Sequence, residues 1–226
     1  MDKFVKNLHE HAVWDWPLRL FHWVLTILVL NQFATAKISG NAMDFHIMGG
    51  YLIFTILLFR IGWGFAGSQN SLFTNFIQPL TEVKRYLYET IVSKQRKIYY
   101  GHNPVGGWAS ITMLFALSLQ TITGLLSDDQ IMFSGPLAHR FSENIVSAAT
   151  TFHSANAWLI IVMIFFHIFA IFSYLILHKN NLINRMINGG HMPFRANLKH
   201  TKNLSVRAVV VFIVSLIILL MMLYLA

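Results

Sequence analysis

The sequence predicts an all-α integral membrane protein in which four transmembrane helices form a bundle and a fifth follows it. Of the 226 residues, 55% are hydrophobic and only 12% are charged, which is about half the charged share of an average soluble domain. The mean hydropathy is +0.54. Five apolar stretches of about 20 residues are each long enough to cross the roughly 30 Å hydrocarbon layer of a bilayer.

The five predicted spans follow one another without an internal repeat or a Pro/Gly/Ser-rich linker. They run from Trp16 to Ala36, His46 to Ala66, Val105 to Leu126, Thr151 to Leu177 and Val206 to Leu225. We therefore expect a single membrane domain over residues 1–226. It has a core at residues 12–190, formed by the first four spans, and an additional transmembrane helix at residues 204–226.

Lysine and arginine are distributed unevenly between the segments outside these spans. They gather near the N-terminus and in the second and fourth connections, at Lys3, Lys6, Arg19, Lys84, Arg85, Lys94, Arg96, Lys97, Lys179, Arg185, Arg195, Lys199, Lys202 and Arg207. The first and third connections carry only Lys37 and Arg140. The positive-inside rule then predicts a cytoplasmic N-terminus and, after five spans, a C-terminus on the outer side. The same asymmetry explains the net charge of +8, so we expect contact with membrane lipid and no nucleic-acid partner.

Two surface helices are predicted in the longer connections. In the second connection, apolar residues recur at helical spacing over Leu80 to Val92, which is typical of an amphipathic helix on the membrane surface. In the third connection, turn residues precede a short surface helix at Arg140 to Ala149.

Four histidines within or at the ends of the spans are the strongest functional signal. Ionisable side chains are costly at membrane depth, so each of them is a candidate functional residue. His153 and His167 are fourteen residues apart in one span, which places them within ~40° on one helix face and ~21 Å apart along the axis. His22 lies ~9 Å into the first span from the cytoplasmic side, and His46 stands at the outer end of the second.

Matching these depths gives two pairs, His46 with His153 on the outer side and His22 with His167 on the inner side. Each pair joins two different helices, which is how helical bundles hold cofactors. We interpret the pairs as bis-histidine iron ligands of two haems b. Because the chain has no cysteine, the haems must be bound non-covalently, and thiolate iron–sulfur clusters are excluded.

Other interpretations of the histidines stay open at this point. The four could serve packing or proton relay, or they could bind zinc, although zinc sites gather three or four ligands at one point. His178 keeps nearly the face of His167 and is an alternative ligand at the cytoplasmic edge.

Three further residues are candidate contacts of the inner haem or of a quinone. Arg60 follows His46 by fourteen residues and Arg19 precedes His22 by one turn. Each of these arginines could pair with a haem propionate, contact a quinone or snorkel to the interface. His102, in the turn that opens the third span, could contact a quinone or transfer protons.

Small residues in the spans permit two interpretations. They could let a flat macrocycle approach a helix backbone, or they could let two helices pack closely. These positions are Gly49, Gly50, Gly106, Gly107 and Gly124.

The sequence resembles the bacterial cytochrome b561 family, which includes the membrane cytochrome b subunits of nickel–iron hydrogenases. The resemblance covers roughly residues 12–190. It rests on motifs that recur in order, at Trp14 to Trp23, Arg60 to Gly67, Gly101 to Gly107, His153 with Ala155 to Ala157, His167, and Asn180 to Gly189. The family's four haem ligands fall on the four histidines that the depth argument selects.

The resemblance implies electron transport across a bacterial inner membrane, between the quinone pool and a redox partner protein. The partner would be a cytochrome c or a hydrogenase-like protein. The connection between the first two spans is shorter than in many hydrogenase subunits, which favours a stand-alone or cytochrome c-coupled member. The rival functions are a stand-alone oxidoreductase that couples superoxide or ferric reduction to quinone, and a non-redox membrane anchor.

Overall fold

The computed structural model describes residues 11–36, 42–93, 99–131, 133–192 and 203–226. Its elements, in chain order, are β1 (His11–Ala12), α2 (Trp16–Thr35), α3 (Ala42–Ala66), α4 (Phe73–Phe76), α5 (Leu80–Ile91), α6 (Pro104–Leu126), the 3-10 turn η1 (Ala138–Arg140), α7 (Glu143–His178), α8 (Leu182–Asn188), β2 (His191–Met192) and α9 (Leu204–Leu225). Five of them, α2, α3, α6, α7 and α9, are long and apolar enough to cross a membrane. The predicted all-α membrane fold and its five spans are confirmed.

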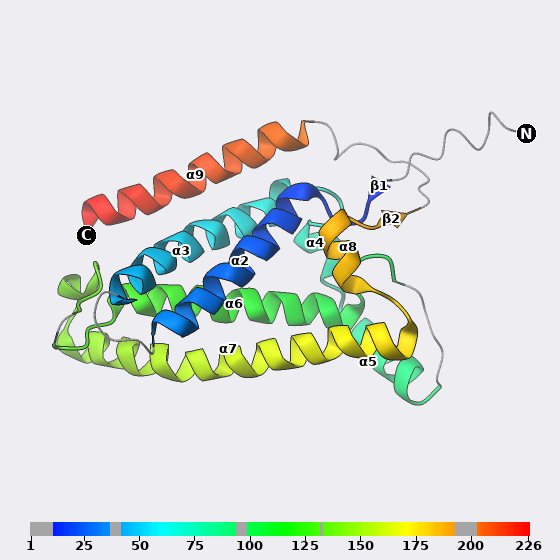
Figure 1. Ribbon diagram of the computed structural model, residues 1–226, viewed down its shortest axis with the longest axis horizontal. Helices are drawn as coiled ribbons and strands as arrows, with labels where there is room; N and C mark the ends of the chain where they lie inside the picture. The colour runs from blue at the N-terminus through cyan, green and yellow to red at the C-terminus, as the bar shows by residue number, and fades with distance from the viewer. Residues whose placement is uncertain (1–10, 37–41, 94–98, 132, 193–202) are drawn as a thin grey trace, which may run out of the picture.

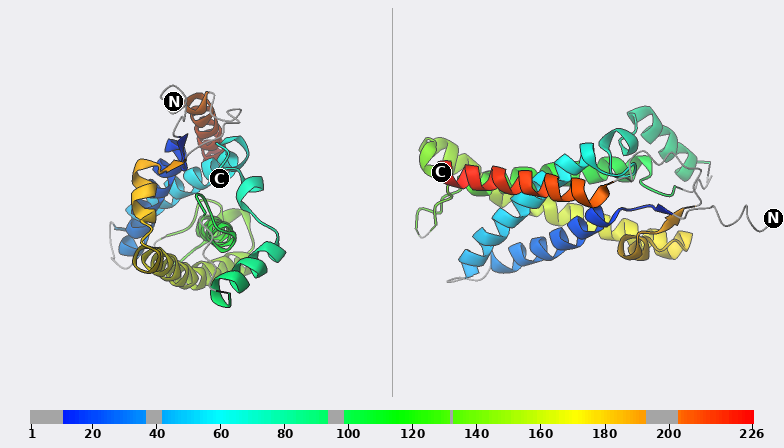
Figure 2. Two further views of the ribbon diagram at one scale, coloured as in Figure 1. Left: turned by 90° about the vertical axis from the view of Figure 1, so that its right-hand side faces the viewer. Right: turned by 90° about the horizontal axis from the view of Figure 1, so that it is seen from above.

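Helices α2, α3, α6 and α7 form the bundle, and α9 lies along α3 on its outer side (Figure 1). Helix α2 packs against α3, α6 packs against α7, and α3 also packs against α6. Within the described residues, α7 packs much less closely against α2 and α3. Figure 2 shows the same arrangement from the end and from above, with α5 and α8 at one end of the bundle. We call this end the α8 end.

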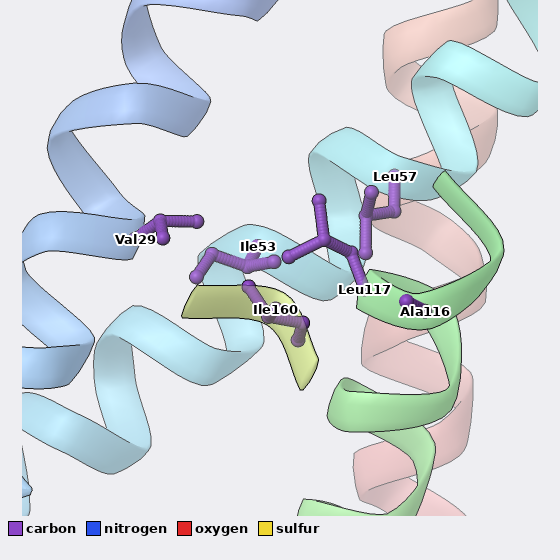
Figure 3. Close-up of a cluster of buried hydrophobic side chains, with 6 residues drawn as sticks. All are labelled: Val29, Ile53, Leu57, Ala116, Leu117 and Ile160. Atoms are coloured by element: carbon purple, nitrogen blue, oxygen red, sulfur yellow. The ribbon is translucent and has the colours of Figure 1, made fainter. Parts of the chain in front are cut away.

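The bundle is held together by a small apolar core at its centre. It combines side chains from all four helices, namely Val29, Ile53, Leu57, Ala116, Leu117 and Ile160 (Figure 3). A second cluster, Leu18, Phe59, Trp63 and Ala208, joins α2 and α3 to α9. Most other large apolar side chains of the spans are exposed, as expected for helices whose solvent is lipid.

Two bundle helices begin with the same kind of side-chain N-cap. The Asp15 carboxylate accepts the Leu18 N–H at 2.8 Å before α2, and the Asn103 side chain accepts the Gly106 N–H at 2.7 Å before α6. A proline follows each cap, where its missing N–H leaves no helix hydrogen bond unmade. The caps fix where α2 and α6 begin, and with them the positions of the histidines that follow.

The surface helices agree with the prediction in one connection and differ in the other. Helix α5 occupies the place of the predicted amphipathic helix. The separate helix expected at Arg140 to Ala149 is wrong, because α7 already begins at Glu143 and continues for 36 residues. No glycine or proline interrupts the chain between Glu143 and His178, so nothing ends the helix at the membrane surface.

A short antiparallel pairing of β1 with β2 ties the start of α2 to the chain after α8. The backbone N–H groups of Val13 and Trp14 donate to Gly190 and Gly189 at 3.1 and 3.0 Å. Gly189 and Gly190 adopt positive φ angles of +96° and +60°, a region that favours glycine because it has no Cβ. The turn therefore places the chain after α8 against the residues that lead into α2.

Candidate haem-binding sites

The structure brings the four histidines together as two facing pairs. The rings of His22 (α2) and His167 (α7) have their centroids 6.4 Å apart, and those of His46 (α3) and His153 (α7) are 6.3 Å apart. All four side chains are half-buried. Along α7 the two pairs are separated by fourteen residues, which is about 21 Å of helix.

These separations suit a metal ion held between two imidazoles. Each metal–imidazole bond is about 2 Å long, and the two such bonds together with the radii of the two five-membered rings span a centre-to-centre distance of this size. Helix α7 packs less closely against α2 and α3 than the neighbouring helices pack against each other, and the histidine pairs face each other across these helices beside the apolar core that includes Ile160. Over the described residues, no three His, Asp or Glu side chains gather at one point, so a zinc site with several protein ligands does not fit.

His46 is held by residues near the end of α2. Its Nδ1 lies 3.2 Å from the Gln32 carbonyl oxygen and 3.3 Å from Thr35 Oγ1. The Gln32 side chain donates in return to the His46 carbonyl at 3.0 Å. A carbonyl oxygen can only accept, so Nδ1 carries the hydrogen and Nε2 is left with its lone pair.

His153 is held in the same way by residues of α6. Its Nδ1 lies 2.9 Å from the Gln120 carbonyl oxygen and 3.4 Å from Thr123 Oγ1, and the Gln120 side chain donates to the His153 carbonyl at 3.0 Å. The Asn156 side chain in turn donates to Gln120 Oε1 at 2.8 Å and so holds the Gln120 side chain in place. Our sequence reasoning missed these residues, although both Gln–Thr pairs show the same spacing of three.

Gly124 places α6 against the ring of His153. A Cβ atom at this position would lie 2.9 Å from His153 Cε1, closer than real Cβ contacts allow. At Gly50, by contrast, a Cβ would meet no atom within 4 Å. The two glycines differ in role, since one accommodates a ligand candidate and the other lines open space one turn after His46.

The His22–His167 pair has different surroundings. His22 Nδ1 is buried and has no hydrogen-bond partner among the described residues, while Thr26 donates to the His22 carbonyl at 2.8 Å. The Trp23 ring meets the His22 ring edge-on at 5.1 Å, and its Nε1–H donates to the Met186 carbonyl of α8 at 3.3 Å. Helix α8 is therefore docked beside this pair.

Arg60 does not snorkel to the interface, since only 6% of it is exposed. Its Nη1 lies 3.4 Å from the Ser71 carbonyl oxygen, and its guanidinium lies 4.9 Å from the Phe73 ring centre. The Ser71 hydroxyl donates to the buried Asp15 carboxylate at 2.5 Å. Arg60 thus belongs to a polar cluster with Asp15, which the segment after α3 covers.

His102 lies at the α8 end, close to the position predicted for it. Its ring centre is 4.7 Å from those of Trp14 and Phe76, and its Nε2 lies 3.1 Å from Ser110 Oγ. The other nitrogen, Nδ1, is buried and finds no hydrogen-bond partner within the described ranges. Burial, aided by the positive charge of Arg60, lowers the pKa of His102 to about 4, so the ring is neutral at pH 7.

Arg19 and Arg185 flank the turn at Gly189. Arg19 Nη1 donates to the Ile187 carbonyl at 2.5 Å, and a Cβ at Gly189 would lie 3.6 Å from the Arg19 guanidinium carbon. Arg19 Nε and Arg185 Nη1 are buried and have no hydrogen-bond partner in the part of the chain that the structure describes. Buried guanidinium donors without an acceptor are costly, so this end of the bundle is suited to an anionic group.

His178, the alternative ligand, is not brought to face another histidine in the described part of the chain. Its ring stacks on that of Tyr174, with centroids 4.9 Å apart. The Tyr174 hydroxyl is held by Tyr86 of α5 at 2.7 Å and by the Asn103 side chain at 2.5 Å. This group closes the α8 end beyond His167.

Comparison with known proteins gives a consistent result. The family model described as prokaryotic cytochrome b561 matches residues 13–189. The probable Ni/Fe-hydrogenase B-type cytochrome subunit of Azotobacter chroococcum mcd 1 is 27% identical over 214 residues, covering 80% of this chain and 88% of the relative. The probable Ni/Fe-hydrogenase 1 B-type cytochrome subunit of Escherichia coli K12 is 24% identical over 218 residues, covering 81% of this chain and 91% of the relative. No solved structure matches the chain.

The family match spans most of the chain and includes all four histidines. Together with five helices that can cross a membrane, it makes the protein a multi-pass membrane cytochrome of the b type, which carries haem b and takes part in electron transport. This chain belongs to the prokaryotic cytochrome b561 family.

Proposed function

We propose that this chain is the membrane cytochrome b of a nickel–iron hydrogenase and that it transfers electrons between that enzyme and the quinone pool. The observation that carries the proposal is the pair of facing histidines at each of two levels of α7, with ring centroids 6.4 and 6.3 Å apart. Each haem b, when bound, supplies a one-electron iron couple.

The four histidines are the proposed axial ligands, with His22 and His167 on the inner haem and His46 and His153 on the outer haem. Two imidazoles at each iron would leave no free site there for a substrate. The proposed chemistry is therefore electron transfer rather than a reaction at the iron, and the two levels of histidines would hold one haem toward each membrane surface.

The anionic edge of the inner haem is assigned to Arg19 and Arg185. Haem propionates are carboxylates, and charge-assisted hydrogen bonds to guanidinium groups are among the strong ones in proteins. The unpartnered buried N–H groups of both arginines support this assignment. Arg60, which the sequence also suggested, is engaged with the Asp15 cluster and is the weaker candidate.

The quinone contact is assigned to the α8 end, at His102. Its neutral ring has one buried nitrogen without a partner, which can hydrogen-bond a carbonyl or hydroxyl of a quinone head group. The rings of Trp14 and Phe76 beside it supply the flat apolar contacts that such a head group needs.

The hydrogenase partner is proposed from the relatives, whose names describe Ni/Fe-hydrogenase subunits and which this chain matches over most of their length. This assignment replaces the preference for a cytochrome c partner that the short first connection suggested. We also propose the bacterial inner membrane as location, with the N-terminus cytoplasmic and the C-terminus periplasmic. Residues 12–190 form the di-haem core, and residues 204–226 the additional helix.

Haem counting on the purified protein tests the ligand assignment. The pyridine haemochrome assay should give two non-covalent haems b for the wild type, one for His167→Ala, and two for the matched control His178→Ala. A single haem in the wild type, or loss of haem from His178→Ala alone, would contradict the assignment.

Reduction and copurification test the function itself. A quinol analogue should reduce both haems of the oxidised protein, and the solubilised chain should copurify with a nickel–iron hydrogenase. Failure of reduction by any quinol would exclude the quinone link. Copurification with a multi-haem cytochrome c instead would move the partner to the other class.

A further inference from the structure

We infer that Gln32 with Thr35, and Gln120 with Thr123, are matched positioning pairs that lower the reduction potential of the haem held by His46 and His153. The inference rests on the proposed bis-histidine ligation and deepens it, because it assigns residues outside the ligand set to the tuning of one haem.

The two pairs make the same set of contacts on opposite sides of the site. In each, the glutamine carbonyl lies within 3.2 Å of histidine Nδ1, and the glutamine side chain donates to the carbonyl of the same histidine at 3.0 Å. In each, the threonine three residues later places its hydroxyl 3.3 or 3.4 Å from Nδ1. The pairs come from α2 and α6, so helices that supply neither ligand of this site hold both of its rings.

The hydrogen bonds at Nδ1 and at the histidine carbonyl together fix the orientation of each ring. The Nδ1–H is shared between the glutamine carbonyl oxygen and the threonine hydroxyl oxygen. The glutamine side-chain amide donates to the backbone carbonyl of the same histidine. Because Nδ1 carries the hydrogen in both rings, both Nε2 atoms keep a free lone pair. Hydrogen bonds of this kind fix the tautomer of a ligating histidine and make it a stronger base toward the metal.

A more basic ligand stabilises the ferric state more than the ferrous state, because ferric iron carries the greater charge. The hydrogen bonds to His46 and His153 therefore lower the reduction potential at their site. At the other site, His22 Nδ1 is buried without a partner. An electron shared between the two sites then resides mainly on the haem of His22 and His167, at the α8 end.

The test is a spectroelectrochemical redox titration of the full-length protein with both haems bound. The variant Thr35→Val/Thr123→Val removes the two hydroxyl acceptors with little change in side-chain volume. We expect the lower of the two potentials to rise. The expected change in the one-electron equilibrium between the haems is on the order of tenfold, which corresponds to about 59 mV. The upper potential and the haem content should stay the same.

Thr121→Val is the matched control. It lies on α6, the helix of Thr123, and in the described part of the chain its hydroxyl donates to the carbonyls of Leu117 and Ser118. A second variant, Gln120→Leu, removes the hydrogen bond from the Gln120 side chain to the His153 carbonyl and should also raise the lower of the two potentials. Should Gln120→Leu lose haem, the decision falls to the double threonine variant.

Three results would overturn the inference: unchanged potentials in the double variant, equal shifts of both haems, or a shift of the same size in Thr121→Val. These results differ from failure of the proposed function. Fewer than two haems in the wild type, or no reduction by a quinol, would refute the function before any variant is compared.

Discussion

Replacing Asp15 with alanine should destabilise the protein by about 3 kcal/mol, because one buried carboxylate serves four donors. It accepts the Leu18 N–H that caps α2, the Trp63 indole N–H at 3.1 Å, and the hydroxyls of Ser68 and Ser71 at 2.5 Å. Loss of the cap costs about 1 kcal/mol. The Trp63 side chain is fully buried, and leaving its N–H unpaired costs about 1–3 kcal/mol. The serine hydroxyls can turn toward each other and add less.

Thermal unfolding in detergent, followed by circular dichroism, measures this effect. For a chain of this size, 3 kcal/mol corresponds to a fall in Tm of roughly 6–12 °C. Asp44→Ala is the control, since Asp44 is exposed in the first turn of α3 and its loss should change the stability by less than about 0.5 kcal/mol. An Asp15→Ala protein that melts within about 2 °C of the wild type would refute the reasoning, and so would an equal fall in the control.

Four further outcomes follow from the described contacts. Gly124→Val should displace His153, whose ring lies 2.9 Å from the added Cβ, and remove one haem in the haemochrome assay, whereas Gly50→Ala should keep both. Tyr174→Phe removes a hydroxyl shared by two partners and should lower the stability by about 1–2 kcal/mol in the same melting assay. Between pH 6.5 and about 4 the unfolded chain protonates at position 102 while the buried His102 does not, so stability falls on acidification. His102→Gln should make this fall in Tm smaller. Carbon monoxide should change the spectrum of the reduced wild type little, because the proposed ligation by two histidines would leave no free site at either iron.

The membrane fold was predictable because it depends on local properties of the sequence. Apolar runs of sufficient length must be helical in lipid, since every backbone polar group needs a partner there. The same local reasoning placed the start of the first span at Trp16. It failed at the start of α7, where the helix continues beyond the apolar stretch to Glu143, because hydropathy marks the hydrocarbon layer and not the end of the helix.

The pairing of the histidines follows from helix periodicity and depth, which the sequence contains. The residues around each histidine cannot be predicted in this way, because they depend on how the neighbouring helices are rotated about their axes. Gln120 meets His153 only once α6 and α7 are packed. Arg60 is buried rather than interfacial only because the chain after α3 folds back over it. A repeated Gln–Thr spacing was visible in the sequence, but its meaning required the fold.

The packing of the bundle has a consequence for how the protein assembles in the membrane. Helices α2 and α3 form one closely packed hairpin and α6 and α7 another, and α7 makes little direct contact with the first hairpin. Each histidine pair spans this gap. The two hairpins already meet through α3 and α6 and through the shared apolar core. With haem held by the histidine pairs, as proposed, each cofactor would add a further connection between the hairpins, which would couple the maturation of the protein to the supply of haem.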